Sequence, residues 1–185
     1  VESCDIYFYK VGRELGADRI AKYARMFGFG RKTGIDLDFE ACGLIPDSRW
    51  KRRAFGTSWQ PGETLSLSIG QSYTLVTPIQ MVNFVSAIFN GGKIYRPYVV
   101  RWVGNDKDKI YSQHPTIIGH LNVNRESLDI IKKALIDAVN ERRGTGRMAR
   151  IKGVAVAGKT GTAQVISVIK KDILYKNSKI PYKYK

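Results

Sequence analysis

The sequence is poor in cysteine and histidine, the side chains that most often bind metals or, for cysteine, form disulfides. Its two cysteines, Cys4 and Cys42, are too few for a disulfide scaffold. The two histidines, His114 and His120, are far from both cysteines in sequence, so we predict no metal site and no cofactor. We expect both thiols to be small, buried or half-buried side chains, although an oxidising compartment leaves one bridge open.

Long apolar runs are also absent. A helix crosses a bilayer only when about 18–20 consecutive residues are mainly apolar. The longest candidate, residues 81–89, is interrupted by Asn83 and Ser86. The sequence shows no signal peptide and begins at Val1 rather than at methionine, so we interpret it as a piece of a longer protein.

Acidic residues are the third deficit. The chain has 16 Asp and Glu against 31 Lys and Arg, which gives a formal net charge of +15. Such an excess of positive charge favours binding near a polyanionic surface. No recognisable nucleic-acid-binding module accompanies this charge, so we interpret the basic residues as solvated loops and predict no nucleic-acid partner. They form three clusters: Arg49 with residues 51–53, residues 142–152, and residues 170–185.

Hydrophobic residues make up 43% of the chain, enough for one domain with a substantial core. Apolar periodicity predicts a pair of helices over residues 6–15 and 18–27, which end at Gly16 and Gly28. Ser3 precedes the first helix, and its hydroxyl is placed to cap it.

Two further helices have clear end signals. Thr77, Pro78 and Gln80 form a capping pattern before a helix that reaches residue 89. That helix is apolar on nearly all sides, which predicts that it is buried. Asn124 is predicted to cap an amphipathic helix through about residue 142.

Glycine, proline and polar residues are dense over residues 29–77, where we predict loops and short strands. Alternating apolar residues predict one strand over residues 63–71 and branched residues predict another over 98–103. The whole chain is predicted to be one partial domain of α+β (α/β) class. Its parts are residues 1–28 (helical pair), 29–77 (loops and strands), 78–143 (helical core with a strand), 153–168 (a further strand) and 169–185 (a mobile basic tail).

The most informative stretch is Val154–Val165, because two enzyme families share its pattern. Residues 153–160 match the phosphate loop G-x-x-x-x-G-K-[ST], and Lys159-Thr160-Gly161 matches the K-T-G element of serine acyltransferases. A phosphate loop follows a buried strand and opens a helix. Here a polar run precedes and alternating branched residues follow, so we favour a strand running through Lys159.

Seven motifs, K-T-G included, occur in one order along nearly the whole chain, and together they are far more specific than K-T-G alone. They resemble class B penicillin-binding proteins, in particular the penicillin-binding protein 2 type that serves cell elongation. Six of the motifs are SCDIYFY at Ser3, GFGRKTGIDL from Gly28, GLIPDSRWKR from Gly43, PGETLSLSIGQ from Pro61, LVTPIQM from Leu75 and NGGKIYRPYVV from Asn90, and the seventh is the K-T-G stretch itself, VAGKTGTAQV from Val156.

The resemblance implies the serine β-lactamase and D,D-peptidase-like transpeptidase fold, with helices packed on an antiparallel sheet that is incomplete here. It implies a D,D-transpeptidase that cross-links peptidoglycan through a serine acyl-enzyme and binds β-lactams. Ser3-Cys4-Asp5 resembles the S-x-N motif with Asp5 in place of asparagine. Ser3 would then relay a proton, and Lys159 would contribute positive charge and a hydrogen bond to Ser3.

The resemblance also assigns substrate contacts. Thr160 and Thr162 would bind the carboxylate of the stem peptide or antibiotic, with Gly161 between them. The N–H of Thr162 would form half of the oxyanion hole, a contribution of typically about 3 kcal/mol. Partners implied by the family are peptidoglycan stem peptides, β-lactams and membrane proteins of the elongation complex. The implied location is the periplasmic face of the bacterial inner membrane, with an anchor outside this chain.

One family element is missing, since the S-x-x-K motif with the nucleophile should precede Ser3. Matches at Ser48–Lys51 and Ser167–Lys170 have the wrong order, and a second K-T-G at residues 32–34 lies in a glycine-bounded loop. We therefore predict that the chain alone is inactive and that its K-T-G strand needs a partner outside the chain. Alternatives are a β-lactam sensor or hydrolase of the same fold, and a phosphate-loop protein.

Overall fold

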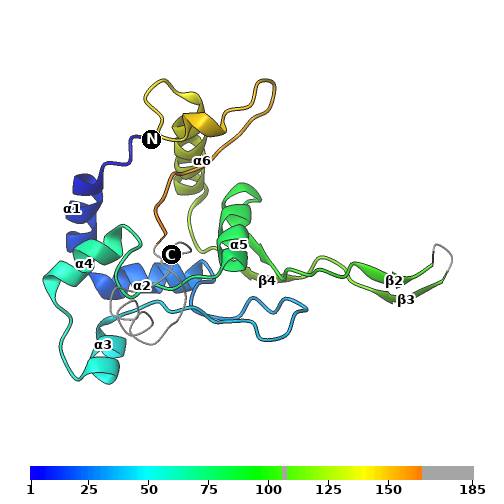
Figure 1. The fold of residues 1–185 in the computed structure, drawn as a ribbon, viewed down its shortest axis with the longest axis horizontal. Helices are drawn as coiled ribbons and strands as arrows, with labels where there is room; N and C mark the ends of the chain where they lie inside the picture. The colour runs from blue at the N-terminus through cyan, green and yellow to red at the C-terminus, as the bar shows by residue number, and fades with distance from the viewer. Residues whose placement is uncertain (106–107, 164–185) are drawn as a thin grey trace, which may run out of the picture.

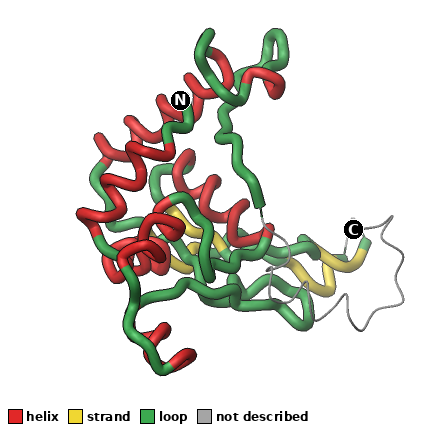
Figure 2. The backbone as a smooth tube through the Cα atoms, turned by 60° about the vertical axis from the view of Figure 1, so that its left-hand side comes forward, coloured by secondary structure: helices red, strands yellow, loops and turns green. Residues whose placement is uncertain are grey.

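The computed structural model describes residues 1–105 and 108–163, which form helices and short antiparallel strands (Figures 1 and 2). Predictions for residues 164–185, including the basic tail and Ser167–Lys170, lie outside the described residues. The helices are α1 (Asp5–Leu15), α2 (Ala17–Met26), α3 (Ser48–Phe55), α4 (Pro61–Ser68), α5 (Pro78–Phe89), α6 (Arg125–Asn140) and the 3-10 turn η1 (Arg147–Ala149). The strands are β1 (Lys93–Tyr95), β2 (Trp102–Gly104), β3 (Lys109–Ser112) and β4 (Ile117–His120).

The predicted helical pair at the start of the chain is confirmed as α1 and α2. Gly16 separates them at φ 75°, a backbone conformation that glycine adopts without steric cost. The predicted cap is wrong, because α1 begins after Cys4 and Ser3 lies at φ 55°. The Ser3 hydroxyl instead contacts Lys159.

The second region, residues 29–77, is more helical than predicted, since it contains α3 and α4. The strand predicted over residues 63–71 is wrong. Glu63 accepts a hydrogen bond from the Gln60 N–H at 2.8 Å, and proline occupies the first position of α4. These local helix-start signals, together with packing of α4 on α1, outweigh the alternation of apolar residues.

Helix α5 begins as predicted, with the Thr77 hydroxyl accepting from the Gln80 N–H and the Gln80 side chain accepting from the Thr77 N–H. The prediction that α5 is buried all round is wrong. Ala87 and Ile88 are buried, whereas a second face of the helix is exposed. Among the described residues, only one side of α5 is packed against other segments. Several of its apolar side chains on the other side therefore remain exposed. The exposed residues are Met81, Val82, Val85 and Phe89.

The strands form two separate antiparallel pairs, β1 with β4 and β2 with β3. The strand predicted over residues 98–103 overlaps β2 in part. In Figure 1 the β2–β3 ribbon projects away from the helices, whereas β1 and β4 lie beside α5. The core cluster lies where β1 and α5 meet. It consists of Ala87, Ile94, Leu121 and Leu128, with Phe27 and Val123 packed against it.

The strand predicted through Lys159 is not formed among the described residues of this segment. Ile151 and Val154 make an isolated bridge, and residues 155–163 carry no strand or helix. A strand needs a hydrogen-bonded neighbour, and the described residues provide none at this position. The sheet is therefore less complete than predicted.

Both cysteines are exposed and unpaired, so the prediction that Cys4 and Cys42 are buried or half-buried is wrong. Cys4 directly precedes α1 as its N-cap residue. The carbonyl of Cys42 accepts a hydrogen bond from the Gln80 side chain. None of the helices in residues 1–105 and 108–163 combines the length and apolar character needed to span a bilayer.

Candidate active site

Two candidate residues from opposite ends of the chain meet. Lys159 Nζ donates a hydrogen bond to Ser3 Oγ at 2.8 Å. Lys159 also donates to the carbonyl oxygen of Thr160 and lies 3.5 Å from the Thr160 hydroxyl oxygen. Ser3 is half-buried and Lys159 is exposed, so one side of the pair faces solvent. The predicted hydrogen bond is present, and the catalytic roles of both residues stay predictions.

The N-terminal segment is held in place beside the loop that follows α6 (Figure 1). Glu2 and Arg143 form an ion pair at 2.8 Å. The amide of Thr145 donates to the Val1 carbonyl at 3.3 Å. Ser3 therefore reaches Lys159 from a backbone that is fixed at two preceding positions.

The K-T-G segment is held by α6. The Gly158 N–H donates to the Leu135 carbonyl at 3.0 Å, and the Asn140 side-chain amide donates to the Val156 carbonyl at 2.9 Å. Leu135 and Asn140 both belong to α6, so this helix holds the backbone that leads to Lys159. The same helix also precedes the loop that holds the N-terminal segment.

The predicted substrate-binding residues follow Lys159 directly. The Thr160 hydroxyl donates to the Thr145 hydroxyl at 3.0 Å. The Thr162 carbonyl accepts from the Gln71 side-chain amide at 2.9 Å. A Cβ atom added to Gly161 meets nothing within 4 Å, so the space beside this backbone is open.

Asp5 is not part of the contact network. It is the first residue of α1, is exposed, and makes no hydrogen bond or ion pair with the described residues. A carboxylate in the first turn of a helix interacts favourably with the helix dipole, which accounts for its place there. A direct role for Asp5 stays a prediction from the resemblance.

Sequence reasoning missed three residues that hold the K-T-G segment, namely Gln71, Asn140 and Thr145. Gln71 and Asn140 have no local signal, because each forms its bond through the side chain to a backbone carbonyl distant in sequence. Thr145 has a local signal for the turn alone, since glycines flank it, and nothing in the sequence indicates its contacts with Val1 and Thr160.

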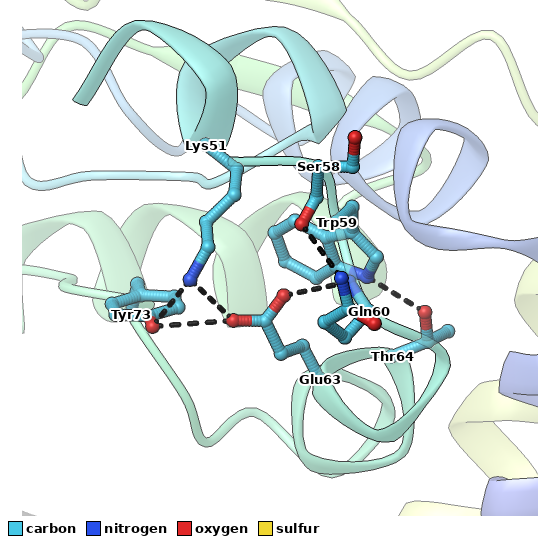
Figure 3. A network of polar contacts seen from close by, with 7 residues as sticks. All are labelled: Lys51, Ser58, Trp59, Gln60, Glu63, Thr64 and Tyr73. Carbon is cyan, nitrogen blue, oxygen red and sulfur yellow. Dashed lines mark hydrogen bonds and ion pairs between the residues drawn. The ribbon is translucent and has the colours of Figure 1, made fainter. Parts of the chain in front are cut away.

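The lysine of the Ser48–Lys51 match belongs to a separate polar network (Figure 3). The Lys51 ammonium donates to Glu63 at 2.5 Å and to the Tyr73 hydroxyl at 2.8 Å, and it lies 4.5 Å from the centre of the Phe55 ring. Ser48 donates instead to a carboxylate of α2, at Asp18. The serine and lysine of this match therefore do not contact each other.

The charges in this network stabilise each other. Hydrogen bonds to Glu63 and Tyr73 raise the pKa of Lys51 above its usual value. Burial alone raises the pKa of Glu63, but hydrogen bonds from Gln60 and Lys51 outweigh it and lower that pKa. A lysine with a raised pKa stays protonated and cannot act as a general base, so the structure agrees with excluding Lys51 as a nucleophile partner.

The second K-T-G is a structural turn. Glu40 accepts from the Thr33 amide and hydroxyl, both at 2.6 Å, and from the Gly34 amide at 3.0 Å. Burial raises the pKa of Glu40, but these three hydrogen bonds outweigh it and lower that pKa. Thr33 is buried and its hydroxyl is occupied, so it cannot contact a substrate.

The phosphate-loop alternative lacks its structural context. Residues 147–149 form η1 before the pattern, and no helix follows Thr160 within the described residues. A phosphate loop needs a helix N-terminus directed at the phosphates. Gly153–Thr160 therefore does not form such a loop.

The comparisons with known proteins agree with the K-T-G interpretation. The family model described as penicillin binding protein transpeptidase domain matches residues 1–178. The chain therefore belongs to the penicillin-binding protein transpeptidase family.

Among relatives, the peptidoglycan D,D-transpeptidase MrdA of Acinetobacter baumannii is 39% identical over 170 residues, which cover 91% of this chain and 25% of that protein. The solved structure of penicillin-binding protein 2 from Helicobacter pylori is 35% identical with a TM-score of 0.77, covering 89% of this chain and 30% of that chain. The same protein in complex with MreC gives 34% identity and a TM-score of 0.74, covering 89% and 29%. The chain thus spans only about a quarter to a third of these relatives.

Proposed function

We propose that this chain is part of a peptidoglycan D,D-transpeptidase of the penicillin-binding protein 2 type. The protein cross-links stem peptides through a serine acyl-enzyme and is acylated by β-lactams, with the nucleophile outside these 185 residues. The observation that carries the proposal is the 2.8 Å hydrogen bond from Lys159 to Ser3, which joins two motifs of the family in space.

The geometry supports a proton relay through Ser3. Its hydroxyl oxygen accepts from the Lys159 ammonium, so its own proton remains free to donate outward. Positive charge beside a hydroxyl favours release of that proton. Ser3 can therefore relay a proton in each half-reaction. It gives its own proton to the leaving amine as it receives the proton that the nucleophile releases, and the transfer runs in reverse when the acceptor amine attacks, while Lys159 holds Ser3 in place.

The residues after Lys159 form the proposed contact with substrate. Thr160 and Thr162 present hydroxyls for a carboxylate, next to the positive charge of Lys159. Gly161 leaves the neighbouring space open to a ligand. The Thr162 N–H is proposed to donate to the oxyanion, and the bond from Gln71 to the Thr162 carbonyl limits movement of this backbone.

We propose that the protein acts at the periplasmic face of the bacterial inner membrane, held by a segment outside this chain. The Helicobacter pylori relative has been solved in complex with MreC. That complex supports an equivalent partner for this protein, and the family resemblance implies that its partners are membrane proteins of an elongation complex.

Labelling with a fluorescent penicillin tests the proposal. A protein of the relatives' length that contains this chain is expected to form a stable covalent adduct, whereas residues 1–185 alone are expected to form none. Ser48→Ala in the longer protein serves as control and is expected to leave labelling unchanged. Labelling of the 185-residue chain that is lost on Ser48→Ala or Ser167→Ala contradicts the proposal, and so does a longer protein that is never labelled.

A further inference from the structure

One side chain, Thr145, joins the two segments that carry the candidate site. Its hydroxyl lies 3.3 Å from the Val1 carbonyl oxygen and 3.0 Å from the Thr160 hydroxyl oxygen. A carbonyl oxygen only accepts, so Thr145 donates to Val1 and accepts from Thr160. The Thr145 amide donates to the same carbonyl at 3.3 Å. The hydrogen bonds therefore run in one direction from Thr160 through Thr145 to Val1.

The glycines on both sides determine where Thr145 lies. A Cβ atom at Gly144 would be 2.3 Å from the Ala138 carbonyl oxygen, which is too close for any other residue. The Gly146 amide donates to that same carbonyl at 2.8 Å. The turn is thus pressed against the end of α6, and this contact directs the threonine toward the two segments.

An exposed ion pair lies beside the connection on one side. Arg143 contacts Glu2 at 2.8 Å, two positions before Thr145. On the other side, Thr160 has no second hydrogen-bond acceptor among the described residues for its hydroxyl. Thr145 is therefore the contact that determines the rotamer of Thr160, and it keeps the Thr160 hydroxyl 3.5 Å from the Lys159 ammonium.

We propose that Thr145 is a positioning residue for the carboxylate-binding side of the site, a role that rests on the proposed function above. It fixes the position of the Thr160 side chain and ties the segment that carries Ser3 to the segment that carries Lys159. When a carboxylate binds, the Thr160 proton turns from Thr145 to the carboxylate, and the Thr145 hydroxyl donates to Thr160 in its place while the Thr145 amide keeps its bond to the Val1 carbonyl. It does not itself touch the reacting atoms. The ligand class concerned is an anion with a carboxylate, such as a stem peptide or a penicillin.

The test is the acylation rate of the full-length protein with two probes, a penicillin with its free carboxylate and the methyl ester of the same penicillin. Thr145→Val removes the hydroxyl and keeps the shape, whereas Thr145→Ser keeps the hydroxyl. We expect Thr145→Val to lower the second-order acylation constant for the carboxylate about five- to tenfold, as loss of one hydrogen bond implies. The loss should appear as a raised apparent dissociation constant for the penicillin. The acylation constant of Thr145→Ser should stay within about twofold of wild type. With the methyl ester, Thr145→Val should leave the acylation constant unchanged.

A second arm separates positioning from general destabilisation. In a Thr160→Val background, Thr145→Val should cause no additional loss, because its effect passes through the Thr160 hydroxyl. Thr145→Ala provides the same comparison if Thr145→Val does not fold. An unchanged constant for the carboxylate, or an equal loss with the ester, overturns the inference while leaving the proposed function intact. A wild-type protein that is not acylated overturns both.

Discussion

Lys159 donates a hydrogen bond to Ser3 at 2.8 Å, although 156 positions separate them in the chain. Ser3 is held by the contacts of the two residues before it, and Lys159 is held through α6. Ser3 also adopts φ 55°, which is uncommon for a residue other than glycine, and such backbone conformations cluster at active sites and ligand-binding segments. The pairing therefore results from the fold and not from any local sequence signal.

The close approach of α1 to α4 gives a stability prediction. A Cβ atom at Gly12 would lie 2.3 Å from the Ser68 Cβ atom. Alanine favours a helix by about 1 kcal/mol over glycine, but overpacking typically costs about 1–3 kcal/mol. We expect Gly12→Ala to lower the free energy of unfolding, measured by chemical denaturation.

Gly62 provides the matched control, since it is also helical and an added Cβ atom meets nothing within 4 Å. Gly62→Ala should raise the free energy of unfolding by up to about 1 kcal/mol. A rise in both variants would show that helix propensity alone governs them and that the α1–α4 contact is looser than described.

Gln80 is the least exposed of the buried polar residues in the described part of the chain. Its side chain is 2% exposed and donates to the carbonyls of Arg31 and Cys42, both at 2.8 Å. Gln80→Leu keeps the size and leaves these carbonyls without a donor. We expect a loss of about 2–4 kcal/mol in the free energy of unfolding. Val82→Ala, at an exposed position of the same helix, should change it by less than about 0.5 kcal/mol.

The Lys51–Glu63 pair gives a pH prediction. The lowered pKa of Glu63 stabilises the fold above its ordinary value of 4.5, and this stabilisation is lost as pH falls through the folded value. The raised pKa of Lys51 stabilises the fold below 10.5 and is lost as pH rises through the folded value. Both contributions are therefore complete between these limits.

Glu63→Gln removes the carboxylate charge and so tests this window. The difference in melting temperature between wild type and Glu63→Gln should be large at about pH 7 and shrink toward about pH 3. Arg52→Ala, at an exposed position one residue from Lys51, should leave the pH dependence unchanged. A difference that is independent of acid pH would contradict the assigned charge pair.

Helices whose signals are local could be predicted from the sequence. The stops at Gly16 and Gly28, the cap at Thr77 and the cap at Asn124 all depend on residues within one turn. Residues 61–68 carry two conflicting local signals: alternating apolar residues favour a strand, whereas the proline and Glu63 favour a helix start, and the helix forms. Burial of α5 and strand formation around Lys159 depend on neighbouring segments, which periodicity does not specify.

In the candidate site, too, some residues are predictable from local motifs and others are not. Ser3, Lys159 and Thr160 could be named because they lie in recognisable motifs. Gln71 and Thr145 could not be assigned, because their bonds to Thr162 and Thr160 depend on how distant segments pack. The motifs therefore identify the chemistry, and the residues that hold it in place become visible only in the folded chain.

The central claim is that Ser3 and Lys159 act as one pair in serine acyl transfer. The most direct measurement is the second-order constant for acylation by a fluorescent penicillin, in a protein of the relatives' length carrying Ser3→Ala, Lys159→Ala or both. We expect each single change to reduce the constant by about 100-fold or more, and the double change to add little, because the two residues work as a unit. Single variants that acylate at the wild-type rate, or losses that multiply in the double variant, would contradict the account.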